Sequence, residues 1–131
     1  MCGIFGYTGN KKASSRLLAG LKALEYRGYD SAGMFIPGNG VFHAVGSVDN
    51  LIQKAGKGIR GESGIAHTRW ATHGLPTKVN THPHFDCTEN IWIVHNGIIE
   101  NYGALRSDLT KKKHSFTSET DSEVFAHLVE E

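Results

Sequence analysis

Four leucines between residues 17 and 24 constrain the fold of this chain more than any other feature. They recur at helical spacing, so they predict one amphipathic helix with a single apolar stripe, capped by Ser14 or Ser15. The segments on either side, residues 2–7 and Gly33–Ile36, are short, apolar and glycine-containing, as strands are. A helix with one apolar stripe needs a covering surface, and a sheet built from these strands supplies it.

The rest of the chain continues this mixture of strands and helices. The residues from Pro37 to Gly40 predict a hairpin turn into a strand at 41–45, and 64–68 predicts a further strand. Ile91–Val94 is continuously apolar, which predicts a strand buried on both faces. Three more helices are predicted: a short one near 51–55 capped by Asp49, one after Asn101, and a last one after a capping box at 120–123, with Val124, Phe125 and Leu128 facing inward.

Length and charge exclude several classes of protein. The chain has 131 residues, which fits one domain, with 14 Lys plus Arg against 13 Asp plus Glu. This near-neutral balance is unlike the basic surface of a nucleic-acid-binding protein. The run Ile91–Val94 is too short to cross a bilayer, and no signal peptide is apparent. Only Cys2 and Cys87 carry thiols, which favours a reducing, cytoplasmic setting.

The long polar stretch from residue 69 to 89 is rich in histidine and threonine, and loops of this length are often functional. His82, His84 and Cys87 would make a small metal-binding module there. Structural zinc usually has paired Cys or His spacings, which this stretch lacks. We therefore expect hydrogen-bonding histidines and no metal.

Cys2 has two interpretations. It could be a small apolar residue that starts a strand. Alternatively, trimming of Met1 would leave it with a free α-amine, a group whose pKa of about 7.7–8.0 leaves roughly 10–20% unprotonated at pH 7. Such an amine can take the proton from a nucleophile on its own residue.

Two other pairs of residues also have a structural and a chemical interpretation. Asn96 and Gly97 form a turn signal, yet a side-chain amide followed by a backbone N–H can also stabilise an oxyanion. Arg69 and Asp121 could be solvated charges, or they could hold the carboxylate and ammonium of a free amino acid.

Six segments, taken in order, resemble the class II glutamine amidotransferases, and most closely the members that aminate sugar phosphates. The similarity runs along essentially the whole chain, and its longer blocks are highly specific. The segments are Cys2–Gly6 (CGIFG), Tyr26–Gly33 (YRGYDSAG), His67–Gly74 (HTRWATHG), His82–His84 (HPH), His95–Asn101 (HNGIIEN) and Ser118–Glu123 (SETDSE).

The resemblance implies an α+β fold of the N-terminal-nucleophile hydrolase type, a four-layer α/β/β/α sandwich of antiparallel sheets. It implies that Cys2 attacks the amide of L-glutamine with its own amine as base, while Asn96 and Gly97 hold the oxyanion. Further roles are implied for the substrate-binding and site-ordering residues: carboxylate binding by Arg69, ammonium binding by Asp121, completion of the pocket by Thr72 and His73, a lid at Trp70, and ordering of the closed site by Arg27.

The resemblance also implies no cofactor, a sugar-phosphate acceptor bound by a separate isomerase domain, and a homodimer in the full-length protein. On this basis residues 1–131 are the N-terminal portion of a type 2 glutamine amidotransferase domain, and we expect the chain to be truncated. Missing strands would leave apolar faces uncovered. The alternative is a folded binding or assembly module without turnover, because truncation or a retained Met1 would prevent catalysis.

Overall fold

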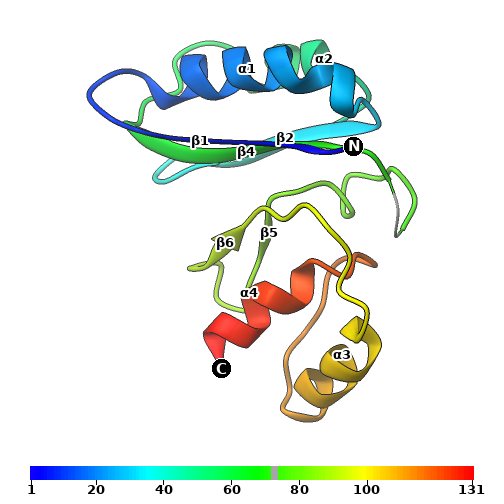
Figure 1. The fold of residues 1–131 in the computed structure, drawn as a ribbon. Coiled ribbons are helices and arrows are strands. Elements are labelled where there is room, and N and C mark those ends of the chain that lie inside the picture. The colour runs from blue at the N-terminus through cyan, green and yellow to red at the C-terminus, as the bar shows by residue number, and fades with distance from the viewer. Residues whose placement is uncertain (72–73) are drawn as a thin grey trace.

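A computed structural model describes residues 1–71 and 74–131 (Figure 1). The chain mixes helices and strands, as the sequence patterns predicted. The elements are β1 (Gly3–Thr8), α1 (Ala13–Leu24), the short 3-10 helix η1 (Glu25–Arg27), β2 (Ser31–Ile36), β3 (Gly40–Val45), α2 (Val48–Ala55), β4 (Ser63–Arg69), β5 (His84–Phe85), β6 (Trp92–Ile93), α3 (Tyr102–Lys111) and α4 (Glu123–Glu130).

A four-stranded antiparallel sheet in the order β1-β4-β2-β3 organises the first half of the chain. Helices α1 and α2 cover one face of this sheet, and β5, β6, α3 and α4 lie on its other side (Figure 1). The layers therefore follow the order helix, sheet, sheet, helix, as expected for the four-layer sandwich. We call β1–β4 with α1 and α2 the helix–sheet half, and residues 74–131 the polar half.

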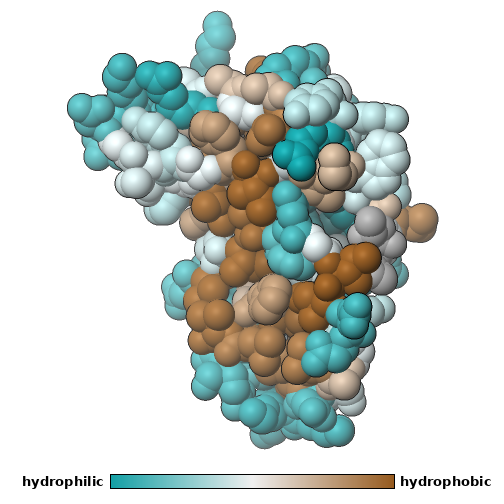
Figure 2. Space-filling model, viewed as in Figure 1, coloured by the Kyte–Doolittle hydropathy of each residue, from teal (hydrophilic) through white to brown (hydrophobic). Residues whose placement is uncertain are grey.

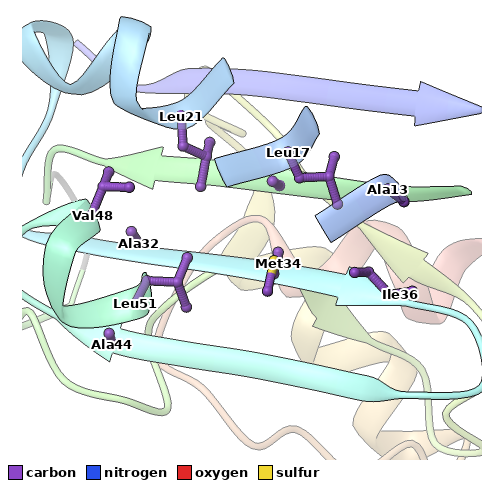
Figure 3. Packing of buried hydrophobic residues seen from close by; sticks show 10 residues of the cluster. Ala13, Leu17, Leu21, Ala32, Met34, Ile36, Ala44, Val48 and Leu51 are labelled. Carbon is purple, nitrogen blue, oxygen red and sulfur yellow. The ribbon is translucent and has the colours of Figure 1, made fainter. Parts of the chain in front are cut away.

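The core of the helix–sheet half lies between α1, α2 and the sheet (Figure 3). Leu17 and Leu21 of α1 are fully buried against Met34 of β2. Side chains alternate between the faces of a strand, so alternate β2 residues enter this core while Gly33 and Phe35 face the polar half. Burial of this apolar surface holds the helices onto the sheet.

The polar half is assembled differently. Its two strands, β5 and β6, pair over only two residues each, and its apolar cluster is centred on Ile99, Leu109 and Val124. Most of its buried side chains are polar, and each such group needs a hydrogen-bond partner. These buried polar residues are Asn80, Thr81, His82, His84, Asp86, Ser118, Thr120, Asp121, Ser122, Glu123 and His127.

Apolar side chains also reach the surface of the polar half. Figure 2 shows them gathered over β6 and α4, and continuing upward toward the four-stranded sheet. Helix α4 contributes Phe125, Leu128 and Val129, of which Val129 is 66% exposed. The prediction that Phe125 and Leu128 face inward is therefore wrong; Val124 is buried, as predicted. In the ranges that the structure covers, no helix is both long and apolar enough to cross a bilayer.

Several local predictions also need correction. The apolar run at 91–94 forms strand only at Trp92–Ile93 and is half-buried, because Trp92 stacks on Phe35 at the border of the two halves and is not enclosed on both faces. Helix α1 begins at Ala13, so Ser14 and Ser15 lie inside it and cannot cap it. Asp49 likewise lies inside α2.

The predicted capping box at 120–123 is also absent, because Glu123 is the first helical residue of α4. Its carboxylate instead accepts hydrogen bonds from the backbone N–H groups of Thr117 and Ser118, at 2.8 and 2.7 Å. Glu123 thus fixes the segment that leads into the helix. Asn101 does occupy the N-cap position of α3, as predicted, but its side chain makes no capping hydrogen bond there.

Candidate active site

Strand pairing places Cys2 at the border of the two halves. Strand β1 runs antiparallel to β4, with Gly3 opposite Thr68, and the Gly3 N–H donates to Thr68 Oγ1 at 3.1 Å. Cys2 therefore lies beside the end of β4, where its Sγ accepts the Trp70 N–H at 3.1 Å. The half-buried thiol is held at a strand end, facing a cavity.

Asn96 approaches Cys2 from the polar half, three residues after β6. Its Nδ2 donates to the Cys2 carbonyl oxygen at 3.0 Å, and its Oδ1 lies 2.8 Å from His67 Nε2. His67 Nε2 also lies 3.2 Å from the His95 carbonyl oxygen, so two acceptors face one nitrogen and that nitrogen carries the proton. Asn96 therefore has its oxygen anchored and its N–H₂ group turned toward Cys2.

Burial keeps His67 neutral. Its imidazole projects from strand β4 and is buried. Desolvation lowers the pKa of His67 to about 4, although the hydrogen bonds to Asn96 and His95 oppose this shift. The ring contacts His82 with centroids 4.1 Å apart and ring planes tilted by 32°, and His82 in turn contacts His84 at 4.3 Å and 58°. We call these three residues the histidine column. It links β4 of the four-stranded sheet to β5, and its first member, His67, contacts Asn96.

Gly97 is required by its backbone conformation. Its φ is +140°, and a Cβ at this position would lie 3.1 Å from His95 Nε2. Glycine accepts both conditions without strain. The predicted catalytic residues Cys2, Asn96 and Gly97 all line one cavity of about 500 Å³. Its lining consists of Met1, Cys2, Arg27, Trp70, Asn96, Gly97 and Ile98.

Arg27 and Trp70 line this cavity from the helix–sheet half. Trp70 is 45% exposed and meets the Tyr29 ring edge-on, with centroids 5.7 Å apart. Arg27 ends η1, just before the turn into β2. A lid at Trp70 and an ordering role for Arg27 stay predictions. Thr72 and His73, predicted to complete the pocket, lie outside the described residues.

Arg69 and Asp121 are buried next to the cavity and do not line it. The Arg69 guanidinium donates to the carbonyl oxygens of Leu75 (3.2 Å) and Gly74 (3.1 Å). Burial lowers the pKa of Arg69, and the charges of Cys2, Asp30 and Asp121 oppose that shift. Asp121 accepts the Ile99 N–H at 2.7 Å. Their predicted contacts with an amino-acid substrate stay predictions.

Sequence reasoning missed three residues that position this site. His67 orients Asn96, Thr68 anchors the start of β1, and Asp30 accepts the Ala71 N–H at 2.8 Å. All three lie within the recognised motif blocks, so the blocks carried the signal. Period-two alternation along β4 would also have placed His67 on the same face as Arg69.

The metal-binding module considered as an alternative for His82, His84 and Cys87 is not assembled. His82 and His84 belong to the buried histidine column, and His84 Nε2 lies 2.8 Å from Thr120 Oγ1. Cys87 lies elsewhere, beside His114 and His127. The three residues are separated because His84 points from β5 into the interior, whereas Cys87 lies in the turn between β5 and β6.

The sequence as a whole identifies the class of this protein. A family model described as a glutamine amidotransferase domain matches residues 52–131, and the chain belongs to that family. The resemblance inferred from the motif blocks is therefore confirmed.

Individual relatives narrow the family to one kind of enzyme. The chain is 54% identical to glutamine–fructose-6-phosphate aminotransferase (isomerizing) of Thermococcus kodakarensis, and 53% identical to the enzyme of that name from Helicobacter pylori. Both similarities cover 100% of the chain and 22% of the relative. The chain thus spans about a fifth of the length of the curated relatives it matches.

Solved structures show the same fold. One described as the allosteric regulatory enzyme of purine biosynthesis has a TM-score of 0.84 at 27% identity, covering 99% of this chain and 29% of the other. The glutamine phosphoribosylpyrophosphate amidotransferase of B. subtilis has a TM-score of 0.82 at 26% identity, with the same coverages. The predicted N-terminal-nucleophile hydrolase fold is confirmed.

Proposed function

We propose that this chain hydrolyses the side-chain amide of L-glutamine, with Cys2 as the nucleophile. The observation that carries the proposal is the pairing of Cys2 with Asn96. Both line one cavity, and the Asn96 amide points its N–H₂ group at Cys2, with its oxygen anchored by His67. A donor fixed before substrate arrives stabilises a developing oxyanion without reorganisation during the reaction.

The reaction divides into two balanced steps. The α-amine of Cys2, freed by removal of Met1, takes the thiol proton as Sγ attacks the amide carbon, and Asn96 Nδ2 with the Gly97 N–H holds the resulting oxyanion. Collapse of this intermediate breaks the C–N bond; the ammonium returns its proton to the leaving nitrogen, which departs as ammonia. A thioester remains on Cys2.

Water completes the cycle. The α-amine, again unprotonated, takes a proton from a water that attacks the thioester carbon, and the same two donors hold the second oxyanion. Collapse expels Sγ, which regains the proton, and glutamate leaves. Arg69 and Asp121 are proposed to hold the α-carboxylate and α-ammonium of glutamine, with Thr72 and His73 completing the pocket, Trp70 closing over it and Arg27 ordering the closed site.

Asn96→Ala tests the oxyanion assignment. Removing one such donor lowers turnover by about 10²–10³-fold, so we expect glutamate release to fall by that factor while glutamine binding stays within a few-fold. The measurement is glutamate release from protein whose amino terminus has been sequenced. Asn10→Ala, an exposed amide in the loop before α1, is the matched control. Wild-type turnover in Asn96→Ala would remove Asn96 from the mechanism.

Met1 gives a second test of the same proposal. While Met1 is attached, the Cys2 nitrogen is an amide with no basicity, and Met1 itself lines the cavity. Its removal therefore frees the base and opens the substrate space. A glutamine-like electrophile should label the Met1-free chain rapidly and the Met1-bearing chain slowly. Equal labelling in intact-mass spectra would argue against the α-amine as base, and turnover-free glutamine binding would favour the binding-module alternative.

The wider context follows from the relatives' names. We infer that residues 1–131 form the N-terminal portion of a type 2 glutamine amidotransferase lobe, and that its ammonia aminates fructose 6-phosphate to glucosamine 6-phosphate in a separate isomerase domain. A cytoplasmic homodimer is the proposed full-length state. Covalent fusion of the chain to such an isomerase domain should couple glutamine consumption to aminosugar formation in a one-to-one ratio.

A further inference from the structure

A second group of reactive side chains lies in the polar half, away from Cys2. Cys87 follows β5, His114 follows α3, and His127 and Glu130 lie one turn apart on α4. One ligand atom from each of these four residues lies within 4.8 Å of all the others. Three separate segments of chain thus converge on one point through a thiol, two imidazoles and a carboxylate.

Five distances within this group are close to those of a tetrahedral metal centre. The two Nδ1 atoms of His114 and His127 lie 3.3 Å apart, and Cys87 Sγ lies 3.7 and 3.5 Å from them. Glu130 Oε2 lies 3.0 and 3.2 Å from the same two nitrogens. Zinc bonds of about 2.0–2.1 Å to nitrogen and 2.3 Å to sulfur at tetrahedral angles place ligand atoms about 3.3–3.6 Å apart.

The surroundings of these four residues support the same interpretation. Both imidazoles turn Nδ1 toward the shared point. The Nε2 of His114 lies 2.9 Å from a Glu131 carboxylate oxygen, whereas the buried Nε2 of His127 is 3.7 Å from Glu123, beyond hydrogen-bond distance. A carboxylate behind the outer nitrogen fixes a metal-binding imidazole in the correct tautomer. Cys87 Sγ also accepts the Ser115 N–H at 3.4 Å, a contact that stabilises a thiolate.

We propose that Cys87, His114, His127 and Glu130 bind one zinc-type divalent cation in a tetrahedral site that fastens the β5–β6 turn to α4 and to the end of α3. The mixed sulfur and nitrogen donor set suits Zn²⁺ better than the hard cations Mg²⁺ and Ca²⁺, which prefer oxygen. With four protein ligands the site is closed, so its role is structural.

Binding is a ligand exchange without oxidation or reduction. The metal gains one bond each to Sγ, the two Nδ1 atoms and one carboxylate oxygen, and loses its water ligands. The Cys87 thiol proton passes to solvent, so binding releases protons and strengthens as the pH rises.

Metal analysis of the two cysteine variants tests the proposal. The chain is stripped with a chelator, incubated with Zn²⁺ and passed through a desalting column. We expect one zinc per chain in wild type and in Cys2→Ser, and at least a tenfold loss of affinity in Cys87→Ser. Because Cys2 is the other thiol, it is the matched control. Equal zinc retention by both variants, or none by wild type, would overturn the site.

Cobalt reports the geometry independently of affinity. Co²⁺ in place of zinc should give a thiolate-to-cobalt charge-transfer band and intense tetrahedral d–d bands in wild type and Cys2→Ser, and no charge-transfer band in Cys87→Ser. A weak octahedral spectrum with no sulfur band in wild type would mean adventitious binding only and would overturn the proposal.

Two glutamate variants test the site if Cys87→Ser fails to fold. Glu130 is near the surface, with its side chain 20% exposed, so Glu130→Gln should fold. We expect it to weaken zinc binding at least tenfold and to lower the zinc-dependent rise in melting temperature, while the exposed Glu100→Gln matches wild type. Equal zinc affinity in the two variants would exclude Glu130 as a ligand.

Discussion

The two halves of this molecule are held together by different forces. The helix–sheet half pairs strands over five or six residues each and buries an apolar cluster of ten residues beneath α1 and α2. The polar half pairs strands over two residues and encloses mostly histidines, hydroxyls and carboxylates. Apolar burial is non-directional and tolerates small shifts, whereas a buried polar network demands that every partner be present.

The candidate active site lies where these halves meet. The helix–sheet half supplies Cys2 and Arg69 from strand ends, and the polar half supplies Asn96 and Asp121 from loops. A stable sheet thus fixes the proposed nucleophile, while a hydrogen-bonded network fixes the proposed oxyanion donor. The proposed reaction therefore depends on the join between the halves as much as on either half.

Gly33→Ala should break that join and have the largest effect. A Cβ on Gly33 would lie 2.0 Å from the His82 carbonyl oxygen, so backbone must separate from backbone. We expect a loss of more than about 4 kcal/mol in the free energy of unfolding, measured by urea titration. Gly103→Ala, where a Cβ meets nothing within 4 Å in α3, should instead gain about 0.5–1 kcal/mol. Equal effects would show that the close approach is unimportant.

Leu21→Ala should weaken the helix–sheet half alone. Leu21 is fully buried against the sheet, so truncation removes apolar contact and leaves a cavity, which costs about 3 kcal/mol in unfolding free energy. Denaturant titration measures the loss. Leu75→Ala removes an equal volume from a leucine that is 71% exposed and should change stability by less than about 0.5 kcal/mol. A small effect at Leu21 would contradict the apolar account.

Glu123→Gln probes the polar half. The carboxylate accepts hydrogen bonds from the N–H and hydroxyl groups of both Thr117 and Ser118, and the amide nitrogen of glutamine would face two of these donors. We expect a loss of about 2 kcal/mol in thermal or chemical unfolding. The exposed Glu62→Gln serves as control. Wild-type stability in Glu123→Gln would mean that the network is redundant.

Protonation of each buried histidine at low pH should lower the free energy of unfolding by the smallest amount of these four changes. Burial lowers the pKa of His67 to about 4 and of His84 to about 3, against about 6.5 when unfolded. The unfolded chain therefore binds more protons below pH 6.5, and stability falls as the pH drops toward 4. From pH 7 to 5.5 each histidine loses about 1 kcal/mol, measured by urea titration in chelator. His84→Gln should flatten this slope; an unchanged slope would contradict the assignment.

The sequence predicted the helix–sheet half better than the polar half, for a physical reason. The helical spacing of Leu17 and Leu21 predicts their burial, and the turn residues from Pro37 to Gly40 predict the β2–β3 hairpin. The buried histidines have no comparable periodic signal, because the partners of His67 and His84 lie far away in the chain. Glu123 has none either, because it binds the irregular segment at Thr117 and Ser118. Ile91–Val94 misled for the related reason that Trp92 is covered from one side by Phe35.

The candidate active site shows the same difference between what local sequence predicts and what depends on distant segments. The motif blocks indicated Cys2, Asn96 and Gly97, which do share a cavity. They could not indicate that His67 sets the Asn96 amide, nor that Cys87 joins residues from α4, since both depend on which segments meet in space.

Asn96 donates its hydrogen bond to the carbonyl oxygen of Cys2 and not to its sulfur. On the Cys2 side, the contact between the two halves at this point is therefore made by backbone, and the reactive atom takes no part in it. An alkylating glutamine analogue could occupy Sγ permanently while the amide-to-carbonyl contact persists. The contact that joins the two halves at this point therefore does not depend on the chemical state of the sulfur.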